Sequence, residues 1–524
     1  MSKEKSKAFL KGTISLSISV IITKILGVAF KVPLSYVLGD EGMGYFNTAY
    51  AIYGFFYILC TAGVPKSIAL VLAEHRSIDE KGAENIFILR SALALFTKIG
   101  VFLTLVNITC APALARFVGN GKATLSIFAI APSILFVSLS GVLRGYLNSS
   151  EKLTPIAISQ LLEGVVKLGL GLALAFVGVK ISGANTVVSA LAILGITIGS
   201  AVSFLYMMFV AFCKNKDVNI GQKLSVDIKY IDGQIIKNAL PIALCSSLLN
   251  LTSTIDLTVI IKRLVQNGMS EAYANSIYGN YTTLAVPMFT LVISVLSPLA
   301  TSYMPRLSNI AVKGDKEHFN SELNKLLMIT ILISVPASLA FFFYSFDLLD
   351  VLFSVQSSAI GADMLVYLSL GLSMLATLTV SNTALESKGK IGVTVLSLLI
   401  GALTKFVVSY ALIGQGNIGV FGAPIGTVTS YAVSLLVSLF ALELYGVKTY
   451  AVLKNILIYL IGLISFYPPY ALIYAKGVGG NSFVSMVISL TVSGVIYVIC
   501  LCCTYFIFRR LNMFKMHKKR DNVL

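Results

Sequence analysis

The sequence has few charged residues and few of the side chains that carry out catalysis. Of its 524 residues, 12% are charged, three are histidines and none is tryptophan. His75, His318 and His517 lie far apart, and the seven cysteines are an odd number scattered through apolar runs, so neither residue type predicts a metal site or a disulfide framework. No polar connector is long enough to gather a conspicuous catalytic set. We therefore predict no enzyme, no metal and no bound cofactor.

Hydrophobic residues, by contrast, make up 56% of the chain, and the mean hydropathy is +0.87. Apolar runs of about 20 residues, each long enough to cross roughly 30 Å of hydrocarbon as a helix, recur from end to end. Barrel strands would alternate apolar and polar residues over about ten positions, and these runs are continuously apolar. We predict an all-α polytopic membrane protein. The fourteen predicted spans are approximately 11–37, 44–72, 84–110, 124–147, 154–178, 185–212, 238–263, 277–305, 323–346, 360–384, 391–413, 420–444, 452–475 and 482–508.

The basic residues predict the orientation of these spans. With the N-terminus in the cytoplasm, 27 of the 40 lysines and arginines fall in cytoplasmic segments and four fall on the opposite face. This asymmetry is typical of a membrane protein with an even number of spans and both termini in the cytoplasm. Most of the net charge of +17 therefore reflects topology, and we predict no nucleic-acid partner. The basic tail from Arg509 to Arg520 is suited to contact with membrane lipids.

An internal repeat predicts the domain organisation. At an offset of 238 residues, the stretch around Lys152 and Lys167 falls without gaps on the stretch around Lys390 and Lys405. Helices four and five thus match helices ten and eleven, which predicts two six-helix lobes in parallel orientation. The predicted parts are an N-terminal lobe, a polar cytoplasmic linker, a C-terminal lobe, and a final part with helices 13 and 14 and the basic tail, over residues 1–212, 213–237, 238–444 and 445–524.

Several lysines lie inside the predicted spans, where a charge costs roughly 2.5–3.5 kcal/mol unless it faces protein or water. Lys24, Lys31 and Lys66 have no acidic residue within four positions. Without such partners they could form an anion site between the lobes. Lys31 and Lys66 could instead extend to the membrane interface.

Other ionisable residues within spans have candidate partners. Glu163 precedes Lys167 by four residues, so the two share a helix face and could neutralise each other. Asp256 lies about two turns before Lys262 and Arg263. Arg144, at the inner end of its helix, is equally suited to a gate and to a headgroup anchor. The predicted residues for gating or coupling are Lys66, Arg144, Glu163, Lys167, Asp256 and Lys405.

Prolines mark where helices of the bundle could bend. Gly63 and Pro65 lie late in the second predicted helix, and Pro287 and Pro298 interrupt the eighth. A proline removes a backbone hydrogen bond and kinks or breaks a helix. Because these breakers fall in paired helices of the two lobes, we predict hinges there.

Four motifs carry a family resemblance. They are Thr23-Lys-Ile-Leu-Gly27, Leu38-Gly-Asp-Glu-Gly-Met-Gly44, Val142-Leu-Arg-Gly-Tyr146 and the run from Pro155 to Glu163. Together they resemble the stage V sporulation protein B branch of the polysaccharide-transport family. Its wider superfamily includes multidrug and toxin extruders, oligosaccharide-lipid flippases and lipid II flippases. The resemblance covers nearly the whole chain.

The resemblance implies a flippase that moves an undecaprenyl-pyrophosphate-linked saccharide to the outer leaflet by alternating access. In such relatives the lobes rock about a central cationic cavity lined by helices one, two, seven and eight. It implies that Lys24 and Lys31 bind the pyrophosphate. We add Lys262 and Arg263, at the end of the seventh predicted span, to the predicted cationic cavity. Where lipid II flippases have two arginines and a glutamate in helix two, this chain has Tyr57, Ile58 and Ala62. That departure favours a broader saccharide-lipid cargo.

Several alternatives stay open at this point. The same superfamily contains cation-coupled multidrug extruders, and a passive scramblase could have an identical cavity. Coupling to H⁺, Na⁺ or the membrane potential is open, as is a cell-wall synthase partner. The cargo is either a peptidoglycan precursor or a polysaccharide unit, and the role is either sporulation-specific or vegetative.

Overall fold

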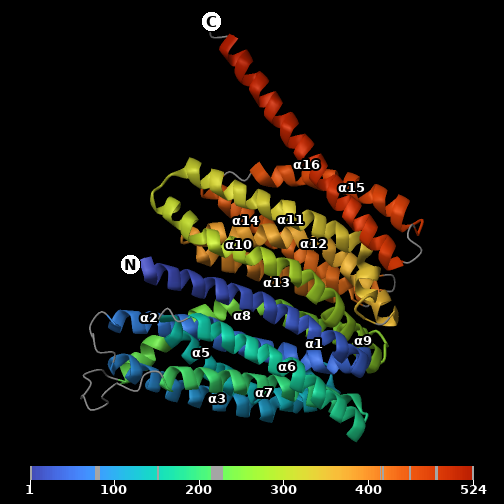
Figure 1. The fold of residues 1–524 in the computed structure, drawn as a ribbon. Coiled ribbons are helices and arrows are strands. Elements are labelled where there is room, and N and C mark those ends of the chain that lie inside the picture. Colours follow the sequence, from blue (N-terminus) through green and yellow to red (C-terminus); the bar gives the residue numbers. More distant parts are fainter. Residues whose placement is uncertain are drawn as a thin grey trace. The chain divides into compact units, whose positions relative to one another are not determined.

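The computed structural model of the chain describes residues 3–76, 83–149, 153–213, 228–353, 355–413, 415, 418–447, 450–477 and 482–521. Every regular element within these residues is a helix (Figure 1). In hydrocarbon each backbone N–H and C=O must be satisfied within the protein, and a helix does this within one segment. The predicted all-helical membrane fold is confirmed.

The helices divide into two compact units. Unit 1 comprises residues 1–283 and 402–426, and unit 2 comprises residues 284–401 and 427–524. Helix α13 (Ile391–Leu412) and helix α14 (Gly422–Leu444) each contribute residues to both units. The predicted two-lobe repeat concerns internal symmetry, which these units do not test, so it stays a prediction. Most of the predicted linker 213–237 lies outside the described residues.

The remaining helices of unit 1 are α1 (Lys3–Ile58), η1 (Leu59–Gly63), α2 (Val64–Arg76), α3 (Ala83–Phe117), η2 (Gly121–Ala123), α4 (Thr124–Ile130), α5 (Ser133–Ser149), α6 (Leu153–Ile181), α7 (Asn185–Cys213), α8 (Ile228–Gln266), α9 (Glu271–Asn280) and η4 (Gly419–Phe421). One hydrophobic cluster in the core of unit 1 includes Phe30, Leu34, Phe46, Ile127 and Ile193. Ser270 caps α9 by accepting a hydrogen bond from the N–H of Tyr273.

Helix α1 consists of two helical arms that meet at Gly39. The backbone of Gly39 has a φ of 62°, a conformation that glycine adopts without the steric cost a Cβ imposes. The apolar part of α1, Ile22–Ile58, has 37 residues. At 1.5 Å per residue it would measure roughly 55 Å if straight, far more than the hydrocarbon thickness. The turn at Gly39 therefore accounts for the two spans predicted on either side of it.

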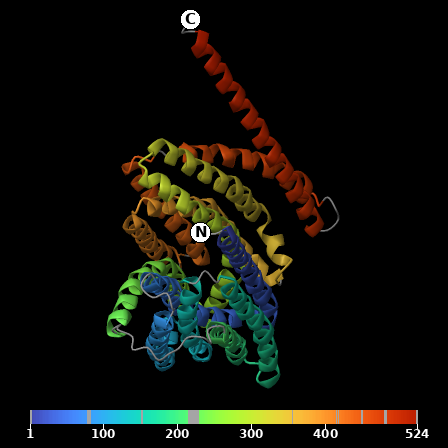
Figure 2. The same cartoon turned by 60° about the vertical axis from the view of Figure 1, so that its left-hand side comes forward.

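In unit 2 the further helices are α10 (Val286–Val312), α11 (Lys316–Asp350), α12 (Val355–Ser387), α15 (Tyr450–Pro469), η5 (Tyr470–Tyr474) and α16 (Ser482–Asp521). The helix η3 (Tyr281–Ala285) joins α9 to α10 across the unit boundary. The core includes Phe319, Leu327, Tyr344, Leu385 and Phe466. The end of α16 extends past the other helices of its own unit in both views (Figures 1 and 2).

Eleven helices among the described residues are long and apolar enough to cross a membrane, and a shorter apolar helix covers Ile458–Tyr474. One of the eleven, in α1, includes the turn at Gly39. The chain is therefore a multi-pass membrane protein. The exact count of fourteen spans stays a prediction.

Two of the prolines that predict hinges follow π-helical turns. The turn η1 ends at Gly63, two residues before Pro65, and η3 ends at Ala285, two residues before Pro287. A π turn shifts the hydrogen-bond register from i+4 to i+5 and often occurs at functional sites. Pro298, in contrast, lies within the continuous helix α10. The structure thus interrupts the α register at 59–63 and 281–285, and hinge motion there stays a prediction.

The orientation of the connectors can be tested by chemical labelling. On a background with the native cysteines replaced by serine, we expect Lys313→Cys and Lys390→Cys to react with a membrane-impermeant maleimide only from the cytoplasmic side. We expect Lys180→Cys and Lys476→Cys to react only from the opposite side, because the distribution of basic residues predicts that topology. All four lysines are exposed. Reaction of both pairs from the same side would contradict the predicted orientation.

Candidate functional site

Lys24 and Lys31 lie on one face of α1 in unit 1. They are seven residues apart, close to two helical turns, so their side chains leave the helix in similar directions. Lys24 is exposed and Lys31 is half-buried. Within the described part of the chain, neither forms an ion pair with a carboxylate. Neither lysine is therefore neutralised by an acidic side chain of the described residues.

The Lys31 ammonium group binds a backbone carbonyl in the π turn just before Pro287. Lys31 Nζ donates to the carbonyl oxygen of Thr282 at 2.9 Å. Thr282 lies in the π turn η3, where the i+5 register would pair its carbonyl with the N–H of residue 287. That residue is proline and has no N–H. Lys31 supplies this carbonyl with a donor from another helix.

Lys167 of α6 reaches α1 as well, but through aromatic rings. Its Nζ lies 5.3 Å from the ring centroid of Phe30 and 4.8 Å from that of Tyr50. Such cation–π contacts stabilise an ammonium group by about 0.5–2 kcal/mol and leave its charge intact. Lys31 and Lys167 are close enough to repel each other electrostatically. These two lysines and Lys24 form a basic cluster on α1 and α6, which we call the α1–α6 basic cluster.

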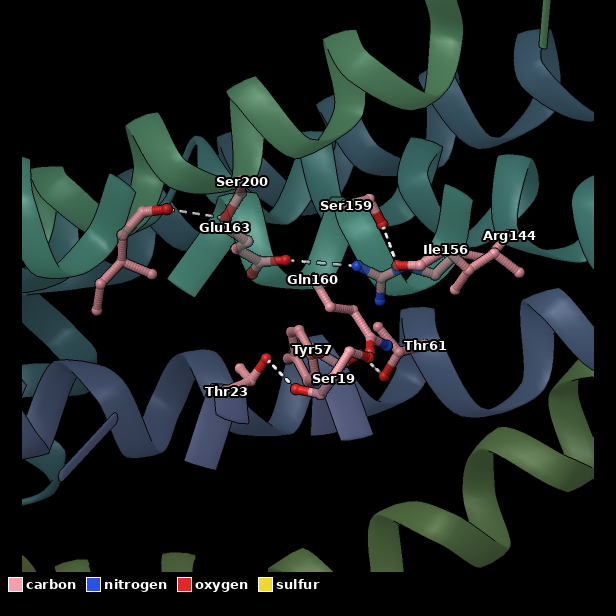
Figure 3. Close-up of polar contacts among 11 residues, drawn as sticks. Ser19, Thr23, Tyr57, Thr61, Arg144, Ile156, Ser159, Gln160, Glu163 and Ser200 are labelled. Atoms are coloured by element: carbon pink, nitrogen blue, oxygen red, sulfur yellow. Dashed lines mark hydrogen bonds and ion pairs between the residues drawn. The ribbon is translucent and has the colours of Figure 1, made fainter. Parts of the chain in front are cut away.

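One polar contact between α1 and α6 and one within α1 lie near Lys24. Ser19 Oγ donates to Gln160 Oε1 at 3.3 Å, and Thr23 Oγ1 donates to the backbone carbonyl of Ser19 at 2.7 Å (Figure 3). Gly164 lets α6 approach closely, since a Cβ there would lie 3.1 Å from a methyl group of Leu26. The position of Lys24 relative to α6 is therefore fixed by contacts on the same turns.

Glu163 pairs with Arg144, and not with Lys167 as the sequence predicts. Arg144 Nη2 lies 3.4 Å from Glu163 Oε2, across α5 and α6 (Figure 3). Arg144 is 8% exposed, so its charge needs this partner inside the bundle. Tyr57 interacts electrostatically with both. The spacing of four residues does put Glu163 and Lys167 on one helix face, but each finds its partner on a neighbouring helix.

Asp256 pairs with Lys405. The internal repeat relates Lys405 to Lys167, and nothing in the sequence relates it to Asp256. Lys405 Nζ of α13 lies 2.7 Å from Asp256 Oδ2 of α8, and the two residues are 2% and 6% exposed. The other carboxylate oxygen, Oδ1, has no hydrogen-bond partner among the described residues. The predicted proximity of Asp256 to Lys262 and Arg263 does not lead to an ion pair with either.

Lys262 and Arg263 contact aromatic residues near the end of α8. Lys262 Nζ lies 4.1 Å from the ring centroid of Phe117. Arg263 Nε donates to the backbone carbonyl of Tyr410 at 3.0 Å. The guanidinium carbon of Arg263 lies 4.4 Å from the centroid of the Tyr410 ring. The structure thus attaches Lys262 and Arg263 to α3 and α13, separately from the α1–α6 basic cluster. Lys66 is exposed on α2.

A junction between α1 and α9 was not predicted from the sequence. Asn280 Nδ2 donates to Asp40 Oδ2 at 3.2 Å. A Cβ on Gly44 would collide with the carbonyl of Asn275, and a Cβ on Gly279 would collide with the carbonyl of Asp40. The glycines therefore permit close contact of the two helix backbones. Asp40 and Gly44 belong to one of the motifs that carry the family resemblance. That motif was the feature of the sequence that could have indicated the junction.

A second contact extends this junction beside Lys31. Asn47 Nδ2 donates to Thr283 Oγ1 at 2.7 Å, one residue beyond the carbonyl that Lys31 binds. The turn η3 is therefore held by two side chains of α1. No group of three or more histidine, cysteine, aspartate or glutamate side chains that could hold a metal ion occurs among the described residues.

Comparison with known families identifies the chain. Residues 9–311, more than half of it, match the family described as "Polysaccharide biosynthesis protein". The chain belongs to the polysaccharide biosynthesis protein family. Residues 282–411 also match the MatE family.

Curated relatives of this family member come from Bacillus subtilis (strain 168). The chain is 24% identical to stage V sporulation protein B over 432 residues, which cover 81% of each protein. It is 21% identical to the lipid II flippase MurJ over 466 residues, which cover 86% of this chain and 85% of the relative.

Solved structures confirm the fold that the polysaccharide biosynthesis protein family implies. The lipid II flippase MurJ in an inward closed conformation matches with a TM-score of 0.72 at 18% identity, covering 94% of this chain and 99% of the other. An inward-facing multidrug resistance MATE family transporter of the MOP superfamily matches with a TM-score of 0.65 at 16% identity, covering 83% and 98%. The chain therefore has the fold of these membrane transport proteins.

The buried pair of Asp256 and Lys405 can be tested by removing one charge. We expect Asp256→Asn to destabilise the protein by about 3–5 kcal/mol, because it leaves the Lys405 ammonium group buried without its partner. The double variant Asp256→Asn, Lys405→Met should recover most of this loss. Fluorescence-detected size-exclusion chromatography after heating in detergent measures the effect. Lys262→Met is the matched control and should cost under about 1 kcal/mol, the energy of a cation–π contact. Wild-type stability of Asp256→Asn would refute the pairing.

Proposed function

We propose that the chain is a flippase that moves an undecaprenyl-pyrophosphate-linked saccharide, either a peptidoglycan precursor or a polysaccharide unit, across the cytoplasmic membrane. It would do so by alternating access, from the inner to the outer leaflet. The cargo contains an anionic pyrophosphate, a polar sugar and an insoluble tail. Its transport needs positive charge in a protected site and contact with the lipid bilayer.

The observation that carries this proposal is the distribution of paired and unpaired charge. Glu163 is neutralised by Arg144, and Asp256 is neutralised by Lys405. Lys24, Lys31 and Lys167 form no ion pair within the described residues. The α1–α6 basic cluster is therefore a cationic region that a bound anion would complete.

We assign the pyrophosphate to Lys24 and Lys31. An ammonium group donates up to three hydrogen bonds, so Lys31 can hold the carbonyl of Thr282 and still bind a phosphate oxygen. Lys262 and Arg263, whose charges rest on aromatic rings, are the proposed continuation of the cationic path. The two buried or half-buried ion pairs and the exposed Lys66 are proposed for gating or coupling.

The names of the relatives and of the family support the proposed class of cargo. One is a lipid II flippase, and the family description refers to polysaccharide biosynthesis. Tyr57 and Ile58 stand where the resemblance to lipid II flippases implies arginines, so we propose the broader class of lipid-linked saccharides. A cell-wall synthase that accepts the delivered precursor, and both termini in the cytoplasm, belong to the same proposal.

The inside-negative membrane potential is the proposed driving force. Moving one charge through 100 mV contributes about 2.3 kcal/mol, and the potential favours outward movement of a net-negative cargo.

A second candidate is a cation-coupled multidrug extruder. The match of residues 282–411 to the MatE family and the similarity to MATE transporters favour it. An extruder of this kind needs an embedded carboxylate that an incoming cation can occupy. Asp256 already holds the Lys405 ammonium group at 2.7 Å, which argues for the flippase. Drug resistance that rises with expression of the chain would favour the extruder.

The proposed anion site predicts the effect of two substitutions. We expect Lys24→Ala and Lys31→Ala each to abolish outer-leaflet delivery of a lipid-linked saccharide in proteoliposomes. Loss of one charged hydrogen bond to the pyrophosphate alone would slow transport more than about tenfold. Lys98→Ala is the matched control, because Lys98 is an exposed lysine of α3 that forms no ion pair within the described residues. Equal membrane abundance and thermal stability of the three variants would exclude misfolding. Wild-type delivery by both Lys24→Ala and Lys31→Ala would refute the site.

A further inference from the structure

Three lysines of unit 2 converge on the turn formed by Tyr445 and Gly446. Lys388 Nζ donates to the carbonyl of Tyr445 at 3.3 Å, and Lys390 Nζ lies 4.9 Å from the ring centroid of Tyr445. Lys316 Nζ lies 3.9 Å from the position that a Cβ on Gly446 would take. The three residues, which we call the lysine trio, come from the start of α11 and from the connector between α12 and α13.

The backbone that carries the lysine trio is well defined. After α12, Gly389 has a φ of 73°, and the N–H of Lys390 donates to the carbonyl of Leu385 at 2.9 Å. This is the Schellman arrangement that ends many helices. Helix α14 ends in the same way, with Gly446 at a φ of 73°. Two capped helix ends and the first turn of α11 thus hold the lysines in place.

Lys388 and Lys316 lie close enough for their charges to repel each other. Lys388 lies over the ring of Phe319, with Nζ 4.7 Å from its centroid. Burial and the charge of Lys316 lower the pKa of Lys388 below its ordinary value. The folded protein therefore accepts an unfavourable concentration of positive charge at this turn.

The three lysines form no ion pair with a carboxylate within the part of the chain that the structure describes. Elsewhere in unit 2, Arg306 and Lys325 share the buried carboxylate of Glu322, at 2.9 and 2.8 Å. The lysine trio has no such ion pair with a described residue. The same unit thus contains one neutralised basic group and one that is left positive.

The lysine trio lies where lipid phosphates lie in a bilayer. Lys316 begins one candidate span, and the spans Ser357–Ser387, Ile391–Leu412 and Gly419–Leu444 end or begin within three residues of Lys388, Lys390 or Tyr445. Lysines at the ends of spans reach the headgroup region and are attracted to anionic lipids. A lipid phosphate there could accept hydrogen bonds from several ammonium groups at once.

We propose that the lysine trio binds the phosphate of an anionic phospholipid, independently of the transported cargo. The ligand class is a diacyl phospholipid with net negative charge, such as phosphatidylglycerol or diphosphatidylglycerol. A free phosphate shares the chemistry but lacks the acyl chains that would lie against the adjoining spans. Bound lipid would offset the repulsion within the lysine trio and hold the ends of α11, α12 and α14 together.

The experiment compares lipid binding by the full-length protein and by Lys316→Ala, Lys388→Ala, Lys390→Ala combined. The protein is purified in neutral detergent, titrated with phosphatidylglycerol or phosphatidylcholine, and examined by native mass spectrometry and thermal unfolding. We expect wild type to retain phosphatidylglycerol preferentially and to unfold at a higher temperature with it. We expect the triple variant to bind it roughly a hundredfold more weakly, since each lysine near an anionic surface contributes to the attraction.

Matched controls decide between a lipid site and the alternatives. The combined Lys180→Ala, Lys313→Ala, Lys476→Ala variant removes the same charge at exposed positions and should bind lipid as wild type does. An equal loss in both triple variants would overturn the proposal, since the effect would then be one of net charge. If the lysine trio serves only to neutralise the carbonyl end of α14, its removal will lower stability without lipid and leave lipid preference unchanged. Competition by inorganic phosphate at concentrations that match the lipid would assign the site to a soluble anion and would also overturn the proposal.

Discussion

The free energy of a charge in hydrocarbon constrains the rest of this structure. An ionised side chain inside a membrane bundle requires a partner, and the protein provides partners of different kinds. Asp256 and Lys405 neutralise each other, whereas Lys167 rests on aromatic rings. Lys31 binds a carbonyl oxygen. Only the first kind of partner sets an opposite charge beside the lysine, which is why the proposed anion site involves the lysines with the other two kinds.

Backbone groups obey the same constraint as side chains. A carbonyl that loses its helical donor inside the membrane must find another donor. Pro287 has no N–H to offer the π turn at Tyr281–Ala285, and Lys31 donates to the carbonyl of Thr282 in that turn. A single contact thus gives this carbonyl a donor and positions a cation. Thr283 of the same π turn accepts a hydrogen bond from Asn47, next to the glycine-mediated junction of α1 and α9.

Composition was sufficient to predict the all-helical membrane class, because long apolar runs have few other solutions. Prolines located two of the interrupted helices, although they could not reveal the π register. The ion-pair partners of Glu163 and Asp256 could not be predicted from the sequence. Periodicity relates residues within one helix, but Arg144 approaches Glu163 from another helix, and Lys405 follows Asp256 by 149 residues. Such pairs depend on which helices pack together, and a single sequence does not encode that in its local spacing.

The contact between Lys31 and the carbonyl of Thr282 has a consequence for how the sequence can vary. Any residue other than proline at position 287 would restore an N–H and give that carbonyl a donor from its own helix. The lysine would then lose its anchor, and an uncharged residue at position 31 would become easier to tolerate. Positions 31 and 287 should therefore change together among homologous chains. Lysine at 31 takes part through its ammonium group, and proline at 287 takes part because it has no backbone N–H.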